Sequence, residues 1–117
     1  GNVLGCKEGR SADRWIDFNF FGHQISAHLQ DFKVASDPRN IVDGDHIPIR
    51  HFGAILPWDQ WQALGDDLKN QGFRFLIPPK IRFKNEAGEQ GTFFLKDPSE
   101  NVLEFKSFQD MELIFKA

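Results

Sequence analysis

Apolar and polar residues alternate in two short runs near the N-terminus. Residues 14–21 alternate, with Trp15, Asp17 and Asn19 on one side of the chain and the apolar Ile16, Phe18 and Phe20 on the other. Residues 24–30 alternate in the same way, and this period of two is typical of half-buried strands. Phe21-Gly22-His23 lies between the two runs and favours a turn. The pattern therefore predicts a β-hairpin.

A short apolar run in the middle of the chain leads directly into a helical pattern. Residues 47–56 are β-rich and predict a strand, whereas residues 58–71 repeat apolar side chains every three or four positions. These side chains are Trp58, Trp61, Leu64 and Leu68. We expect both tryptophans to lie in the core rather than to form a binding platform. Asp59 in the first turn, Lys69 in the last turn and Gly72 just after it are typical of helix ends.

The C-terminal part of the chain predicts further strands. Residues 73–83 predict one long or bent strand. Pro78-Pro79 within it belong at a sheet edge or a bulge, because proline cannot donate a ladder hydrogen bond. Residues 91–95 and 101–108 predict two more strands, and residues 97–100 predict the turn between them.

Three other segments are compatible with more than one structure. Residues 31–46 are polar and broken by Asp37-Pro38 and Asp43-Gly44, which indicates a long loop. Such a loop fits either a lid over a site or a solvated crossover between two halves of the fold. Residues 7–12 fit a short strand or a loop, and residues 109–117 fit a short helix or an added strand.

The order of these elements indicates an α+β fold built from a repeated module. Residues 1–117 are long enough for one domain with its own core. Residues 47–108 predict a strand, a helix and three strands, which is a complete βαβββ module. Residues 1–35 resemble the same module without its first strand and most of its helix, so the chain reads as a weak internal repeat.

Composition and charge narrow the classes of partner. The 117 residues carry a net charge of −3, and no basic patch is visible, which argues against nucleic acid or an anionic membrane as the main partner. No apolar run approaches the roughly 20 residues of a membrane span. The single cysteine, Cys6, excludes an internal disulfide and fits a reducing, cytoplasmic location. A lone cysteine of this kind is typical of a packed small residue rather than a nucleophile.

Two motifs in this frame resemble the vicinal-oxygen-chelate superfamily. They are Pro48-Ile-Arg-His51-Phe-Gly53 before the helix and Asp97-Pro-Ser-Glu-Asn-Val-Leu-Glu104-Phe105 near the end. The superfamily includes glyoxalase I, extradiol dioxygenases, fosfomycin- and bleomycin-resistance proteins and methylmalonyl-CoA epimerase. The second motif is close to the family pattern Asp-Pro-x-Gly-Asn-x-x-Glu, with Glu100 in place of glycine. The resemblance implies one glyoxalase-like domain, whose paired βαβββ modules form a curved, mostly antiparallel sheet around a cavity.

The same resemblance implies a set of metal ligands. His51 matches the ligand on the fifth strand, Glu104 matches the ligand on the eighth, and His28 falls where glyoxalase-like members place a glutamate. The alternation of side chains along each strand is consistent with these three residues facing the cavity. The first strand, which carries an early His or Gln ligand in metal-binding members, is missing from this sequence. Either residues upstream of Gly1 supply this strand and its ligand, or the first ligand is absent. Without a metal, His51 and Glu104 would simply line a polar cavity.

The implied cofactor is a divalent metal, Fe, Mn, Ni or Zn, because histidine and carboxylate ligands suit these ions. The implied function is a metal-dependent lyase or dioxygenase that acts on a small oxygenated substrate chelated to the metal. The alternative is a metal-free protein that sequesters a small molecule, as bleomycin-resistance proteins do. Lys80 and Arg82 fit either surface charges or a site for an anionic substrate. We further expect a homodimer, with no nucleic acid or membrane partner.

Overall fold

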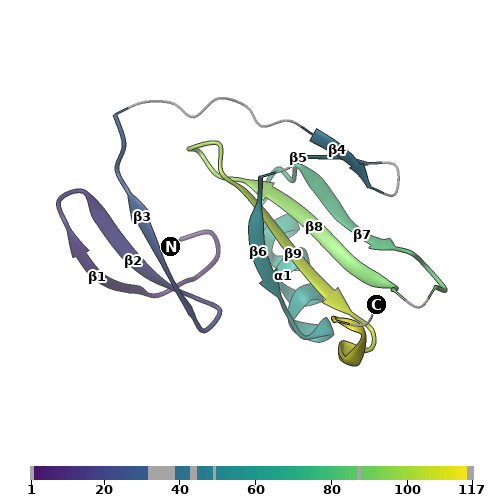
Figure 1. Cartoon of the computed structure of the whole chain (residues 1–117). Helices are drawn as coiled ribbons and strands as arrows, with labels where there is room; N and C mark the ends of the chain where they lie inside the picture. Colours follow the sequence, from purple (N-terminus) through teal and green to yellow (C-terminus); the bar gives the residue numbers. More distant parts are fainter. Residues whose placement is uncertain (1, 32–38, 43–44, 49, 87, 116–117) are drawn as a thin grey trace. The chain divides into compact units, whose positions relative to one another are not determined.

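The computed structural model divides the chain into two compact units, residues 1–34 and residues 35–117 (Figure 1). The residues that it describes are 2–31, 39–42, 45–48, 50–86 and 88–115. Among the described helices, none is long and apolar enough to cross a membrane.

The first unit is an antiparallel sheet of three strands in the order β1-β2-β3. The strands are β1 (Glu8–Ala12), β2 (Trp15–Phe20) and β3 (His23–His28). The predicted hairpin is confirmed, since β2 pairs with β3 and Phe20 lies opposite His23. Phe21 and Gly22 both have positive φ, at 52° and 91°. A two-residue turn of this kind suits the twist of the flanking strands, and the Gly22 N–H donates to Asn19 Oδ1 at 2.9 Å.

Asp17, on the polar side of the predicted hairpin, is buried and only 5% exposed. Its carboxylate accepts hydrogen bonds from Ser26 Oγ at 2.5 Å and from Gln24 Nε2 at 2.7 Å. The hydrogen bond from Ser26 is the main reason that the pKa of Asp17 lies below its usual value. The polar side chains of this hairpin therefore satisfy one another instead of facing water separately.

The second unit contains a four-stranded mixed sheet in the order β6-β9-β8-β7. The elements are β6 (Phe52–Ile55), α1 (Trp58–Asn70), β7 (Ile77–Arg82), β8 (Gln90–Lys96) and β9 (Val102–Phe108). They form the predicted βαβββ module, in which β6 runs parallel to β9 and the other pairs are antiparallel. A 3₁₀ helix, η1 (Met111–Leu113), follows, so the tail begins with a short helix. Edge strand β7 shifts register between Ile77 and Lys80, which confirms the expected place of Pro78-Pro79.

Helix α1 packs on one face of this sheet, against β8 and β9 (Figure 1). Trp61 is 5% exposed, stacks on Phe93 and donates from Nε1 to the Phe105 carbonyl oxygen at 3.0 Å. The expectation that Trp61 belongs to the core is thus confirmed. Gly72, with φ of 72°, ends the helix, and its N–H and that of Phe73 donate to the last turn.

The prediction of a single strand over residues 47–56 is wrong, because this segment contains parts of two separate strands. β5 (Asp45–Pro48) pairs with β4 (Arg39–Val42) in a hairpin, whereas β6 begins only at Phe52 and pairs with β9. An apolar run does not reveal where its pairing partner changes, because strand propensity reflects the neighbouring strands.

Two other predicted boundaries differ from the structure. The segment predicted as a loop, residues 31–46, contains β4 and the start of β5, although Asp37-Pro38 and Asp43-Gly44 lie outside the described residues. The strand predicted over residues 73–83 begins only at Ile77. Its first residues instead complete the helix end and pack onto the core, because the Phe75 ring meets Phe93 edge-on.

Candidate metal site

His51 immediately precedes β6, and its ring has a defined orientation. Nδ1 lies 2.8 Å from the carbonyl oxygen of Pro48. A carbonyl oxygen can only accept, so Nδ1 donates the hydrogen bond, which leaves Nε2 as the atom that would present a lone pair to a metal. The ring also packs edge-on against Phe94, with centroids 5.2 Å apart. These contacts orient Nε2 in the way that metal-binding histidines require.

Glu104 on β9 faces this nitrogen. Glu104 Oε1 lies 3.4 Å from His51 Nε2, and Oε2 accepts a hydrogen bond of 2.7 Å from Thr92 Oγ1. Thr92 is completely buried, so its hydroxyl holds the carboxylate from a fixed position. The side chain of Glu104 is itself 16% exposed and that of His51 28%. One carboxylate oxygen from β9 and one imidazole nitrogen from the residue before β6 thus converge.

This pair fits a divalent metal ion by its donor chemistry. A nitrogen lone pair and a carboxylate oxygen are ligands that Zn, Fe, Mn and Ni accept. Two ligands that each lie about 2.1 Å from one ion are separated by roughly 3.0–3.4 Å in octahedral or tetrahedral geometry. The observed 3.4 Å is within this range. The Pro48 and Thr92 contacts supply the outer hydrogen bonds that orient such ligands.

The register of the strands explains why Glu104 and Thr92 meet. Glu104 lies directly opposite Phe94 on β8, and Thr92 is two residues before Phe94, so the three share one face of the sheet. Leu103 and Phe105, the neighbours of Glu104, are buried. The expected alternation, in which Glu104 faces away from two apolar neighbours, is therefore present. Phe52, the neighbour of His51, is instead 45% exposed, because α1 covers the β8–β9 part of the sheet.

His28 lies in the first unit, at the end of β3 and opposite Trp15. His51 and Glu104 both belong to the second unit, and the structure brings these two together. Within the described ranges, no three His, Cys, Asp or Glu side chains are grouped as a complete ligand set. The ligand roles of His51, Glu104 and His28 remain predictions.

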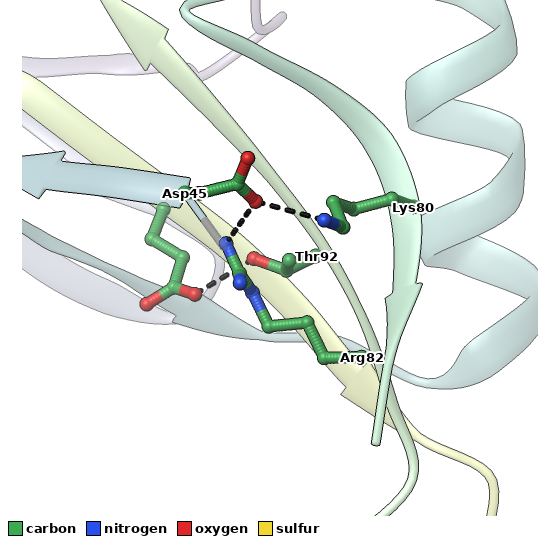
Figure 2. A network of polar contacts seen from close by, with 5 residues as sticks. Asp45, Lys80, Arg82 and Thr92 are labelled. Carbon is green, nitrogen blue, oxygen red and sulfur yellow. Dashed lines mark hydrogen bonds and ion pairs between the residues drawn. The ribbon is translucent and has the colours of Figure 1, made fainter. Parts of the chain in front are cut away.

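A second polar cluster joins Lys80 and Arg82 of β7 to Asp45 of β5 (Figure 2). Lys80 Nζ and Arg82 Nη2 each lie 2.9 Å from the same oxygen, Oδ2 of Asp45. The hydrogen bond from Lys80 is the main cause that lowers the pKa of Asp45 below its usual value. Sequence reasoning singled out both cations but missed Asp45, which sits in a segment read as a loop. It also missed Thr92. The only indication in the sequence is that Thr92 lies two residues before Phe94 and therefore shares a strand face with it.

Comparison with known proteins agrees with this architecture. No protein-family model matches the sequence, and no curated protein matches it significantly. A solved structure from Alicyclobacillus acidocaldarius, a glyoxalase/bleomycin resistance protein/dioxygenase, is 34% identical with a TM-score of 0.76. The alignment covers 97% of this chain and 81% of that chain.

The fosfomycin resistance protein FosX from Listeria monocytogenes has the same fold at lower identity. One of its structures is 15% identical with a TM-score of 0.64, over 96% of this chain and 79% of that chain. Another, a mutant complexed with Mn(II) and 1S,2S-dihydroxypropylphosphonic acid, is 15% identical with a TM-score of 0.67, over 99% and 82%.

The βαβββ module of the second unit, its strand order and these matches define a protein of the vicinal-oxygen-chelate superfamily. On the 34% identity to the Alicyclobacillus protein, the chain belongs to the glyoxalase/bleomycin resistance/dioxygenase family. The fold predicted from the sequence, α+β and glyoxalase-like, is confirmed.

Proposed function

We propose that this protein is a metal-dependent enzyme of the glyoxalase and dioxygenase type, with His51 and Glu104 as two of its metal ligands. The observation that carries the proposal is the 3.4 Å approach of His51 Nε2 to Glu104 Oε1, with each side chain oriented by its own hydrogen bond. The FosX complex with Mn(II) and a dihydroxy acid supports it, because a protein of the same fold binds a divalent metal and an oxygenated small molecule.

In this proposal the chain's own residues hold the reacting centre in place. His51 is oriented by the Pro48 carbonyl, and Glu104 by the buried Thr92 hydroxyl. Phe94 is 1% exposed and packs against the imidazole, so it excludes water from one side of the ring. A bound Fe, Mn, Ni or Zn ion would polarise substrate oxygens and stabilise the negative charge that develops on them.

A turnover screen tests the function. The protein is incubated with catechols, hemithioacetals of 2-oxoaldehydes, and epoxides, each with Mn²⁺ or Fe²⁺ and each with excess chelator. We expect turnover of one class, its loss with chelator and its recovery when the metal is restored. Small-molecule binding that quenches tryptophan fluorescence equally with and without chelator, in the absence of any turnover, would instead identify a metal-free sequestering protein.

The hydrogen bond from Thr92 to Glu104 yields a separate prediction. Thr92→Val removes the hydroxyl at nearly constant volume, so Oε2 of Glu104 loses its partner. We expect the affinity for Mn²⁺ to fall about 10- to 100-fold, as for other outer hydrogen bonds of metal ligands. Calorimetric titration with Mn²⁺ measures the change, and Thr92→Ser, which keeps the hydroxyl, is the matched control. Equal affinities for the Val and Ser variants would contradict the orienting role of Thr92.

A further inference from the structure

Two cationic side chains on β7 converge on one carboxylate oxygen. Lys80 Nζ and Arg82 Nη2 both contact Asp45 Oδ2 at 2.9 Å, and Figure 2 shows all three side chains directed toward one another. The Arg82 side chain is 3% exposed, whereas that of Lys80 is 34% exposed. A buried guanidinium requires an anion beside it, and here Asp45 supplies one.

The carboxylate comes from a different sheet than the cations. Asp45 begins β5, and the described strand pairing joins β5 to β4 alone, whereas Lys80 and Arg82 belong to the four-stranded sheet. A two-stranded hairpin contributes little stability of its own. Asp45 is also 27% exposed, so water reaches this contact. A dissolved anion can therefore reach the place where Asp45 contacts Lys80 and Arg82.

The two cations adjoin the proposed metal ligands. Lys80 lies directly opposite Thr92 in the β7–β8 register, and Thr92 donates to Glu104. Strand partners that lie directly opposite each other have Cβ atoms about 4.5–5.5 Å apart. A small molecule with one end at Glu104 thus needs a length of only a few bonds for its other end to reach Lys80 and Arg82.

We propose that Lys80 and Arg82 form a site for the anionic oxyacid group of the substrate, and that Asp45 occupies this site when no substrate is bound. The assignment of this anion to the substrate rests on the proposed function, whereas anion binding itself does not. Arginine suits the task because its guanidinium donates two parallel hydrogen bonds to a carboxylate or a phosphate-like group. Asp45 then acts as an internal competitor, which lowers the apparent affinity for the external anion.

Anion titrations in excess chelator test this site without any metal. Inorganic phosphate, methylphosphonate and acetate are each titrated at constant ionic strength, while NMR follows the Arg82 Nε–H signal. We expect Asp45→Asn to bind at least one of these anions about tenfold more tightly than the wild type, since the competitor is gone. The anion that gains most identifies the group as tetrahedral or as a carboxylate.

Lys80→Gln supplies the second arm in case the Asp45 variant folds poorly. We expect it to weaken binding of the same anion about fivefold or more, because half of the charge at the site is lost. Lys69→Gln, in the last turn of α1, removes one exposed positive charge elsewhere and is the matched control. Equal affinities of the wild type, Asp45→Asn and Lys80→Gln for all three anions would overturn the proposal, even if metal-dependent turnover is found.

Discussion

His51→Ala and Glu104→Gln are each expected to lower the affinity for Mn²⁺ by more than about 100-fold. Loss of a single outer hydrogen bond at such sites already lowers the metal affinity about 10- to 100-fold, and these substitutions remove a ligand atom itself. His51→Ala removes the imidazole, whose Nε2 is the proposed ligand atom and whose Nδ1 contacts the carbonyl oxygen of Pro48. Glu104→Gln keeps the shape of the side chain but replaces a charged oxygen group by a neutral amide. Calorimetry and the Mn²⁺ electron paramagnetic resonance signal measure the binding.

Two controls separate a ligand effect from a general loss of charge or of histidine. Glu86→Gln removes a carboxylate from an exposed turn, and His23→Ala removes an exposed histidine at the start of β3. Both variants are expected to bind Mn²⁺ as the wild type does. If His51→Ala and Glu104→Gln also retain wild-type affinity while remaining folded, neither residue is a ligand, and the proposed enzyme loses its metal centre.

Gly53→Ala is expected to destabilise the protein by about 3 kcal/mol or more, because strand β6 approaches β9 too closely for a side chain. A Cβ atom at position 53 would lie 1.5 Å from the backbone oxygen of Glu104, its register partner. The parallel β6–β9 pair must therefore separate or shift. Because the same pair brings His51 toward Glu104, we expect weaker Mn²⁺ binding together with the loss of stability.

Chemical denaturation measures the free energy of unfolding for this variant. Gly88→Ala is the matched control, since an added Cβ at position 88 meets no atom of the described residues within 4 Å. We expect the control to stay within about 0.5 kcal/mol of the wild type. A Gly53→Ala protein as stable as the Gly88→Ala protein would show that β6 does not run this close to β9.

Elements with a strong repeating pattern were predicted with accurate limits. The helix was expected over residues 58–71 and spans Trp58–Asn70, because its apolar stripe and Gly72 act through local contacts. The strands of the first hairpin follow in the same way from alternation and a turn motif. Glu100, which stands where the family pattern has glycine, has a φ of 71°, a conformation that glycine adopts more readily than other residues. Asp97 stabilises that turn, accepting hydrogen bonds from the N–H groups of Ser99 and Asn101.

Elements that depend on distant partners were predicted less well. Strand β5 carries no period of two, so its hairpin with β4 was read as a loop, and Asp45 with it. The run over residues 47–56 looked continuous although its two parts pair with different strands. Thr92 was not singled out either, because a threonine in an apolar strand becomes informative only when its cross-strand neighbours are known.

By itself, the sequence determined the order of the βαβββ module, the helix with its buried stripe, and the identity of two residues suited to metal binding. Local periodicity is sufficient for the helix and the strands, because it depends on neighbours within one or two turns. His51 and Glu104 were identified instead by the resemblance of their motifs to those of the vicinal-oxygen-chelate superfamily. The tertiary structure decided that β6 lies beside β9, that His51 meets Glu104 at 3.4 Å, and that Asp45 closes on Lys80 and Arg82. These contacts depend on the register between strands that are distant in the chain, which no local pattern encodes.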